Sequence, residues 1–384
     1  MQSVSVKIPS SQGTTMAGTL DLPDTPPVAF AIFAHCFTCS RFVPAASRVC
    51  KTLAEHGIAC LRFDFPGLGQ SEGEFSDTTF SSNVEDLIAA AEWLTREYEA
   101  PQLLLGHSLG GAAALKAATR PEMDSVGAVV TLGTPFDPAH AVTHLAEHIR
   151  DAEEEGCVTV TLAGRDIDIT REFLEDLADN NPETYLPELR KPLLLIHSPT
   201  DQTVGVENAQ KILRLARFPK SLVTIEADHL FTRGGSAQRA GRLIAEWVQP
   251  YLRPSYTPPS VAEDQVTSRM AVGSRYGAVV ETSSGTLLTD RAKSRGGRGQ
   301  GHSPVDLLMA GLAAASTQAI RDAADGMELT DAHVTLTYVS RNIFERRVEL
   351  VGTLSDAERR TLLDAATSPF QTMLPGIKIL DVPA

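Results

Sequence analysis

The chain has 384 residues, of which 42% are hydrophobic and 21% are charged, and its 34 basic and 48 acidic residues give a formal net charge of −14. Such a composition is ordinary for a soluble globular protein, and the length predicts two or three domains. The negative charge argues against nonspecific binding to nucleic-acid phosphates. No apolar run reaches the roughly 18 residues that span a membrane, and the first residues, MQSVSVKIPSS, lack the pattern of a secretory signal.

All five cysteines lie in the first 157 residues, at Cys36, Cys39, Cys50, Cys60 and Cys157. An odd and sparse set of cysteines argues against a disulfide framework and favours a reducing compartment. We therefore predict a cytoplasmic protein whose cysteines are reduced.

Strand-like runs alternate with helical patterns along residues 1–253. Short apolar runs bounded by turn residues predict buried strands; they are Val28–Ala34, Ala59–Phe65, Leu103–Leu105, Val126–Leu132, Leu193–Ile196 and Leu222–Ile225. The amphipathic stretches between them predict helices, of which one begins near Ser82. This alternation predicts an α/β fold, with a parallel sheet covered by helices on both faces.

Two stretches interrupt the alternation. Residues 136–190 are mostly polar with helical patterns, so we expect a small helical cap inserted over the carboxyl edge of the sheet, where ligands of such folds bind. Three prolines in Arg253–Ser260 cannot continue a helix and indicate a stiff linker over residues 254–265. The sequence therefore predicts one domain over residues 1–253 and a second over residues 266–384.

The stretch LLLGHSLGG at residues 103–111 has the pattern of a strand, a sharp turn and a helix. A G-x-S-x-G motif in this context predicts a nucleophile elbow, in which Ser108 stands above the edge of the sheet. Gly106 and Gly110 fit this prediction, because the helix packs so closely on the strand that a side chain at either position would clash.

A serine hydroxyl needs a base to act as a nucleophile at neutral pH. His229, directly after the run Leu222–Ile225, is the best-placed base. The acid that orients it is expected between nucleophile and base in the sequence. Asp201 follows one predicted strand and Asp137 follows another, and we favour Asp201 because it lies nearer the strand that carries the histidine.

The transition state of acyl transfer to a serine also needs two hydrogen-bond donors for its oxyanion. The backbone N–H of Leu109, next after the nucleophile, is one predicted donor, and the second is expected from the loop after Val28–Ala34.

With the elbow, the Ser…Asp…His order and the stretch DFPGLGQS at 64–71, residues 1–253 resemble the α/β-hydrolases. The resemblance implies the backbone N–H of Phe37 as the second oxyanion donor. It also implies a serine esterase that cleaves small carboxylic esters without a metal or organic cofactor. Cys36 and Cys39 stand where the common oxyanion-loop pattern has glycines.

Cys36 and Cys39 form a C-x-x-C pair, but a catalytic dithiol would need a thioredoxin-like context and a zinc site would need two further ligands. One hypothesis remains for the pair. Its oxidation would strain the loop that carries Phe37 and would lower esterase activity.

Three histidines in the inserted region, His140, His144 and His148, have the spacing of one helix face. Metal binding, lining of the substrate pocket by His140 or His144, and a plain surface position all remain open for them.

The second predicted domain contains strands and helices in a different order. They are strands at Ser268–Ala271 and Gly277–Glu281, a Gly/Arg-rich loop at Arg291–Gly301, a long helix at Val305–Ala324, strands at His333–Ser340 and Arg346–Leu354, a helix at Asp356–Ala366 and a strand at Ile377–Val382. The Gly/Arg-rich loop is interpreted as a solvated loop and not as an RNA-binding segment.

The stretches GHSPVDLLMAGLAAA at 301–315 and SPFQTML at 368–374 resemble the OsmC/Ohr family, small α+β domains that reduce organic peroxides through two cysteines. Ala315 and Ser368 stand at the two thiol positions, so this domain lacks the family's nucleophile. The resemblance implies a homodimer formed through the C-terminal domain, which we interpret as a dimerisation or scaffold module. The whole chain looks like a bacterial fusion of the two families.

Four alternatives to a carboxylesterase are kept open. An amidase or a thioesterase would use the same Ser108, Asp201 and His229. A thiol-dependent peroxide-defence protein would need the two missing cysteines, and a non-catalytic binding protein would not need the serine hydroxyl. No nucleic-acid or membrane partner is expected.

Overall fold

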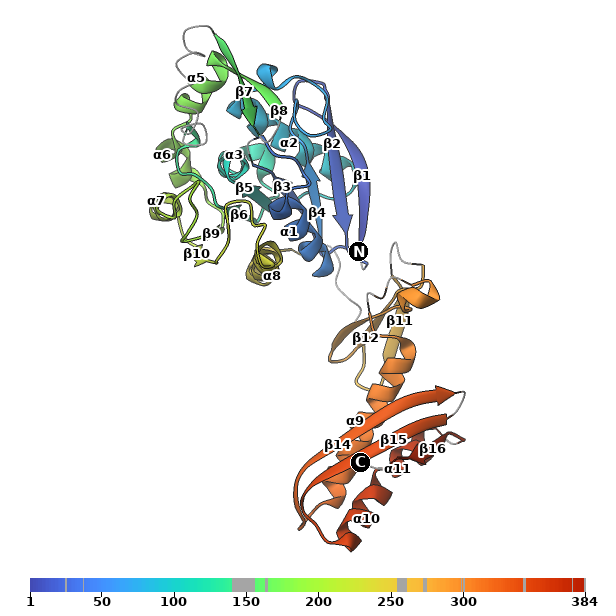
Figure 1. Ribbon diagram of the computed structural model, residues 1–384. Coiled ribbons are helices and arrows are strands. Elements are labelled where there is room, and N and C mark those ends of the chain that lie inside the picture. Colours follow the sequence, from blue (N-terminus) through green and yellow to red (C-terminus); the bar gives the residue numbers. More distant parts are fainter. Residues whose placement is uncertain are drawn as a thin grey trace. The chain divides into compact units, whose positions relative to one another are not determined.

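The computed structural model describes residues 1–24, 26–36, 38–139, 156–162, 165–253, 261–271, 275–297, 299, 301–340, 343–374 and 376–382. Within these ranges the chain forms two compact units, one running to Arg253 and the other beginning at Val261 (Figure 1). The predicted linker lies in part between them, and its described residues, 261–265, have no helix or strand. No helix in the described ranges combines the length and the hydrophobicity needed to cross a bilayer.

An eight-stranded sheet forms the centre of the first unit, in the order β1-β2-β4-β3-β5-β6-β9-β10. The strands are β1 (Gln2–Pro9), β2 (Thr15–Leu22), β3 (Ala29–Ala34), β4 (Ile58–Phe63), β5 (Leu103–His107), β6 (Ala128–Leu132), β9 (Leu193–His197) and β10 (Lys220–Thr224). β1 and β2 are antiparallel additions at one edge, and all pairings from β4 to β10 are parallel. The predicted α/β fold with a parallel sheet is therefore confirmed.

Helices cover both faces of this sheet, as predicted. They are α1 (Pro44–Glu55), α2 (Phe80–Glu97), α3 (Leu109–Ala117), α7 (Glu207–Leu215) and α8 (Ser236–Val248), with short 3₁₀ turns at Phe75–Asp77 (η1), Pro121–Met123, Leu186–Glu188 and Gln249–Tyr251. Alternate residues of β3 belong to different cores: Ala31 and Phe33 pack with α1 and α8, whereas Phe30 and Ile32 pack with α2, α3 and α7. Burial on both faces explains why the central strands are continuous apolar runs.

The insertion between β6 and β9 differs from the helical cap that the sequence predicted. Its described part contains α5 (Arg171–Asp179) and α6 (Pro182–Tyr185), but also an antiparallel hairpin of β7 (Cys157–Leu162) and β8 (Arg165–Thr170). The hairpin forms because apolar and polar residues alternate along this stretch, as they do in a strand with one buried face. Val160, Ile167 and Ile169 are buried, whereas the threonines and aspartates between them face outward. The carboxylate of Asp176 accepts hydrogen bonds from the N–H and hydroxyl of Ser81 at 2.7 and 2.6 Å, which joins α5 to the start of α2.

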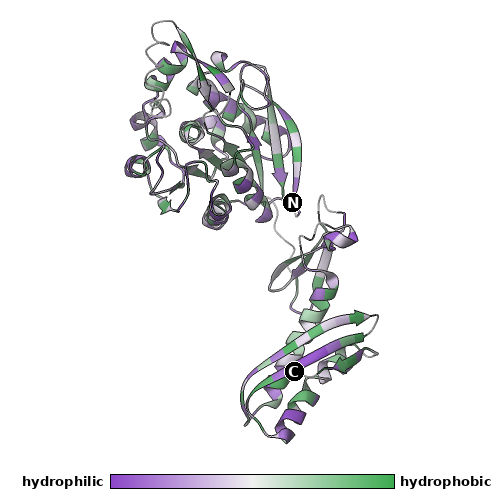
Figure 2. Cartoon of the chain, in the orientation of Figure 1, coloured by the Kyte–Doolittle hydropathy of each residue, from purple (hydrophilic) through white to green (hydrophobic). Residues whose placement is uncertain are grey.

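The described residues of the second unit form two three-stranded sheets and three helices. They are β11 (Val266–Met270), β12 (Ala278–Thr282), β13 (Gly285–Thr289), α9 (Pro304–Ala323), β14 (Glu328–Ser340), β15 (Ile343–Thr353), α10 (Asp356–Ala365), α11 (Ser368–Met373) and β16 (Lys378–Asp381), with a 3₁₀ turn at Lys293–Arg295. α9 begins with a capping box of Ser303 and Asp306 around Pro304. Figure 2 shows hydrophobic and hydrophilic residues mixed along β14 and β15, as expected for strands with one solvated face.

Candidate active site

Ser108 lies in a sharp turn between β5 and α3. Its backbone has φ 53° and ψ −125°, a conformation that is costly for a residue with a side chain. A side chain at Gly106 would lie 2.3 Å from the carbonyl oxygen of Gly110, and one at Gly110 would lie 2.2 Å from that of His35. The two glycines are therefore required by the close approach of α3 to β5 and to the loop after β3.

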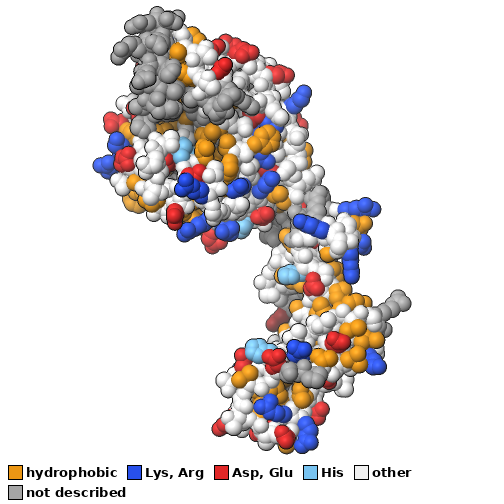
Figure 3. Space-filling view, viewed as in Figure 1, with side chains coloured by type: hydrophobic (Ala, Val, Ile, Leu, Met, Phe, Trp, Pro, Cys, Tyr) orange, Lys and Arg blue, Asp and Glu red, His pale blue; other side chains and the backbone are white. Residues whose placement is uncertain are grey.

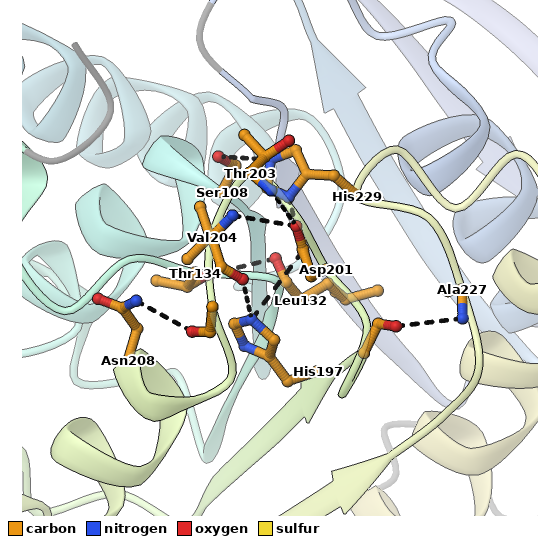
Figure 4. Close-up of polar contacts among 12 residues, drawn as sticks. Ser108, Leu132, Thr134, His197, Asp201, Thr203, Val204, Asn208, Ala227 and His229 are labelled. Atoms are coloured by element: carbon orange, nitrogen blue, oxygen red, sulfur yellow. Dashed lines mark hydrogen bonds and ion pairs between the residues drawn. The ribbon is translucent and has the colours of Figure 1, made fainter. Parts of the chain in front are cut away.

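The structure brings Ser108, His229 and Asp201 together at the carboxyl edge of the sheet (Figure 4). The His229 Nε2 lies 3.1 Å from the Ser108 Oγ, and the His229 Nδ1 lies 2.8 Å from the Asp201 Oδ2. A carboxylate only accepts, so Nδ1 carries the proton and Nε2 is free to accept from the serine hydroxyl. This is the arrangement in which a histidine removes the proton of a serine nucleophile.

The loop after β9 supports Asp201 in this position. Its Oδ1 accepts the backbone N–H groups of Thr203 and Val204 at 2.9 and 3.0 Å, which leaves Oδ2 for His229. Burial raises the pKa of Asp201, but hydrogen bonds from His229 and Val204 lower it by more, so the net pKa is below its usual value. Asp201 therefore carries a negative charge at neutral pH.

Asp137, the rival candidate for the acid, is exposed, and its Oδ1 accepts the backbone N–H of Ala139 at 2.9 Å. Of the two candidate acids, Asp201 is the one that contacts His229.

Of the two predicted oxyanion donors, Leu109 and Phe37, only Leu109 lies within the described residues. Leu109 is the first residue of α3 and is 3% exposed, so its N–H lies at the amino end of a helix, where anions are favoured. Phe37 lies outside the described residues. The flanking loop is described, and its His35 carbonyl packs against Gly110, directly after Leu109.

The cysteines next to Phe37 correct one expectation. Cys36 and Cys39 form a disulfide, whereas the sequence predicted only reduced cysteines. A turn closed by the Cys39 N–H and the Cys36 carbonyl at 3.2 Å brings their Cα atoms to 5.4 Å, within the range of disulfides. Cys50 and Cys60 remain as buried thiols and Cys157 as an exposed one.

His140, His144 and His148 lie outside the described residues, so metal binding, pocket lining and a plain surface position all stay open for them. Within the described ranges, no group of three or more His, Cys, Asp or Glu side chains is arranged to bind a metal. A narrow pocket begins beside Leu109 and is lined mainly by apolar side chains, including Phe65, Leu68, Phe75 and Ala113.

Two buried histidines that support the site were not among the predicted site residues. His197, the last residue of β9, donates from Nε2 to the carbonyl of Val204 at 2.8 Å, in the loop that carries Asp201. His107, the last residue of β5, contacts the backbone of His229. Both stand at the end of an apolar run, directly before a loop, and this position was a signal that the sequence offered.

In the second unit, the two positions at which the resembled family has thiols lie in neighbouring elements. Ala315 is in the middle of α9 and Ser368 is exposed at the start of α11. The hydroxyl of Ser316 donates to the carbonyl of Ala366 at 3.0 Å, which joins α9 to the turn before α11.

Comparisons with known proteins indicate a hydrolase. The family model described as "Serine aminopeptidase, S33" matches residues 39–164. The structure of an esterase domain of a Rhodothermus marinus protein is 43% identical, with a TM-score of 0.53, and the match covers 65% of this chain and 99% of that one. Est1E from Butyrivibrio proteoclasticus, determined with ferulic acid, has a TM-score of 0.53 over 64% of this chain and 98% of its own, and at 22% identity it shows the fold alone.

A curated relative carries a different activity in its name. The human mitochondrial palmitoyl-protein thioesterase ABHD10 is 31% identical over 143 residues, which are 34% of this chain and 44% of that protein. This chain thus spans less than half the length of that relative. Taken with the esterase domain, which the chain covers almost entirely, these similarities identify the protein: it belongs to the α/β-hydrolase family.

Proposed function

We propose that this hydrolase cleaves carboxylic esters through an acyl-enzyme intermediate on Ser108. The observation that carries the proposal is the unbroken hydrogen-bond chain from the Ser108 hydroxyl through the His229 ring to the Asp201 carboxylate. The esterase domain with 43% identity supports the same reaction class.

Each residue of the chain has one role in the proposed reaction. Ser108 attacks the ester carbonyl while His229 takes its proton at Nε2 and later gives it to the leaving alcohol. Asp201 accepts the Nδ1–H of His229, which keeps the ring in the required tautomer and stabilises the imidazolium. The oxyanion accepts from the N–H of Leu109 and, as the family resemblance implies, from that of Phe37. Water then cleaves the acyl-enzyme with the same base.

A thioester is the second candidate substrate. The name of the human relative favours it, and the reaction passes through the same tetrahedral intermediate. A matched pair of p-nitrophenyl ester and acyl thioester with the same acyl group separates the two, because the better substrate has the higher kcat/KM.

Substitution of Ser108 tests the proposal directly. Ser108→Ala removes the nucleophile and should lower kcat by about 10⁴-fold or more, with loss of labelling by a fluorophosphonate probe. Ser125→Ala is a matched control, because its hydroxyl donates to the carbonyl of Pro101, before β5, and is expected to retain full activity. Retained turnover in Ser108→Ala would refute the assignment.

For the second unit we propose dimerisation, as an OsmC-like module without peroxidase chemistry. α9 is rich in apolar residues, yet its buried residues are Leu312, Ser316 and Ile320, and Leu308 is 43% exposed. Hydrophobic side chains stand exposed between charged ones on the face of this unit in Figure 3. A second copy would cover them.

Peroxide defence remains the competing proposal for the second unit. With no thiol at Ala315 or Ser368, we expect no peroxide consumption with a dithiol reductant, and measurable consumption would favour the competitor. A cytoplasmic location also stays a prediction.

A further inference from the structure

His107, directly before the candidate nucleophile Ser108, forms a hydrogen bond with the backbone of the candidate base, His229. His107 has no exposed surface, and its Nε2 lies 2.8 Å from the backbone carbonyl oxygen of His229, which is 122 positions away in the chain. A carbonyl oxygen only accepts, so Nε2 carries the proton and donates it. This hydrogen bond directly connects the end of β5 with the loop after β10.

The remaining surroundings of His107 fix its protonation state. Its Nδ1 is buried, and no described group lies within hydrogen-bond distance of it. Burial, with an electrostatic contribution from the nearby His229 ring, lowers the pKa of His107 to about 3. The ring is therefore neutral in the working range of the enzyme, with the proton on Nε2.

The loop that His107 contacts has little regular structure of its own. It leaves β10 after Thr224 and contains Phe231 at a positive φ of 56°. The His107 ring lies 5.1 Å from the His229 ring and 5.9 Å from the Phe231 ring, measured between centroids. The Nε2 of His229 reaches Ser108 only if this loop keeps its position, and a displacement of about 1 Å in a catalytic group can lower a rate by about 100-fold.

We propose that His107 is a positioning residue for hydrolysis, whose Nε2–H binds the His229 carbonyl and thereby directs the His229 ring at Ser108. The inference rests on the proposed function. His107 takes part in no proton transfer and contacts no substrate in this role. It aligns the base with the nucleophile through the protein backbone.

The test compares three variants of the full-length protein with wild type. Gln places a terminal N–H close to the position of the histidine Nε2, Asn is one methylene shorter, and Leu has no donor. We expect His107→Leu and His107→Asn to lower kcat for a p-nitrophenyl ester by about 10- to 100-fold, with KM changed less than about twofold. His107→Gln should recover at least about tenfold of that loss.

Thermal unfolding of each variant separates alignment from general destabilisation. If His107→Leu does not fold, the Asn and Gln variants still decide the question, since both carry the same amide at different reach. Equal kcat in those two variants, or unchanged kcat in a folded His107→Leu, would overturn the inference. Ser108→Ala is measured alongside: if turnover is independent of Ser108, the proposed function itself has failed.

Discussion

The two units of the chain both contain many apolar residues but bury them to very different extents. In the first unit, cores on both faces of the sheet enclose the central strands completely. In the second unit, one small buried cluster consists of Ile320, Ala324, Leu362 and Ala366, and the other buried hydrophobic side chains include Val279, Leu312, Phe344 and Phe370. Met270 there is 88% exposed. The first unit has the burial of an independent domain, whereas the second exposes more of its apolar surface.

This difference suits the proposed division of the chain into a catalytic first unit and a second unit that forms the dimer. The contacts that join Ser108, His229 and Asp201 all lie within the first unit. The second unit, by contrast, has strong local signals, such as the capping box at Ser303, but little tertiary burial. Variants should therefore affect either turnover or assembly, but not both, and the predictions below test that separation.

The largest expected effect is on turnover. Asp201→Asn should lower kcat by about 10³- to 10⁴-fold, because an amide in place of the carboxylate no longer fixes the His229 tautomer. The oligomeric state, measured by light scattering, should not change. Asp137→Asn is the matched control, since Asp137 is exposed and should tolerate the change. The reverse pattern, with activity lost in Asp137→Asn, would make Asp137 the acid.

The next largest expected effect is on the folding stability of the first unit, which should fall in acid. Burial lowers the pKa of His35, His107 and His197 below the usual 6.5, so the folded unit keeps them neutral while the unfolded chain binds protons. Stability is therefore fully present above pH 6.5 and falls as the pH drops below it, for His107 down to about 3. Each histidine contributes up to about 1.4 kcal/mol per pH unit.

Urea unfolding at pH 7, 6 and 5, followed through loss of esterase activity, measures this slope. His197→Gln removes one titrating group and should flatten the dependence by about a third. A midpoint that does not move between pH 7 and pH 5 would contradict the role assigned to these side chains.

Assembly should respond to the second unit alone. Leu308 lies on α9 and is 43% exposed within one chain. Leu308→Asp puts a charge into the proposed interface and should weaken the dimer by about 100-fold, while kcat stays unchanged. Leu308→Met preserves the apolar contact and is the control. A monomeric wild type, or a dimer that survives Leu308→Asp, would remove the proposed role of α9.

How much of this fold the sequence predicted depended on where each strand lies. All six predicted strands of the first unit exist. Five of them are buried on both faces and are therefore continuous apolar runs such as Leu103–Leu105, whereas β10 is an edge strand with partly buried residues. β1, β2, β7 and β8 were missed, since these strands alternate apolar with polar residues and such alternation over a few residues resembles a loop. In the second unit β13 was missed, for its five residues are mostly exposed.

The candidate site shows a similar limit. Ser108 was predictable because the elbow is a local pattern, and Asp201 because chain order and strand position both pointed to it. The bond from His107 to the His229 backbone was not predictable, since it joins residues 122 positions apart and needs the fold to bring them together. The Cys36–Cys39 disulfide was considered only as a possible oxidation, because spacing alone does not fix the turn between them.

The smallest expected effect concerns this disulfide, and it falls within the first unit because the second contains no cysteine. The sequence hypothesis was that oxidation strains the loop of Phe37 and lowers activity. Thr38, inside the closed turn, has a positive φ of 60°, which fits a strained loop. However, Ser108 and His229 remain 3.1 Å apart with the disulfide formed, so any loss must arise at the oxyanion loop and not in the base.

A contact of Arg41, which follows this turn, should limit the loss of activity on oxidation. The backbone N–H of Arg41 donates to the Asp64 carboxylate at 2.6 Å, which anchors the end of the loop whether or not the cysteines are bonded. We therefore expect a dithiol reductant to raise kcat/KM by about two- to fivefold, less than 1.4 kcal/mol of transition-state stabilisation. Cys39→Ser cannot form the disulfide, so with reductant and with peroxide it should have the higher kcat/KM of the reduced wild type. Cys157→Ser keeps the disulfide and should respond to reductant as wild type does. Identical activity with reductant and with peroxide would show that the loop keeps its donor geometry in both states.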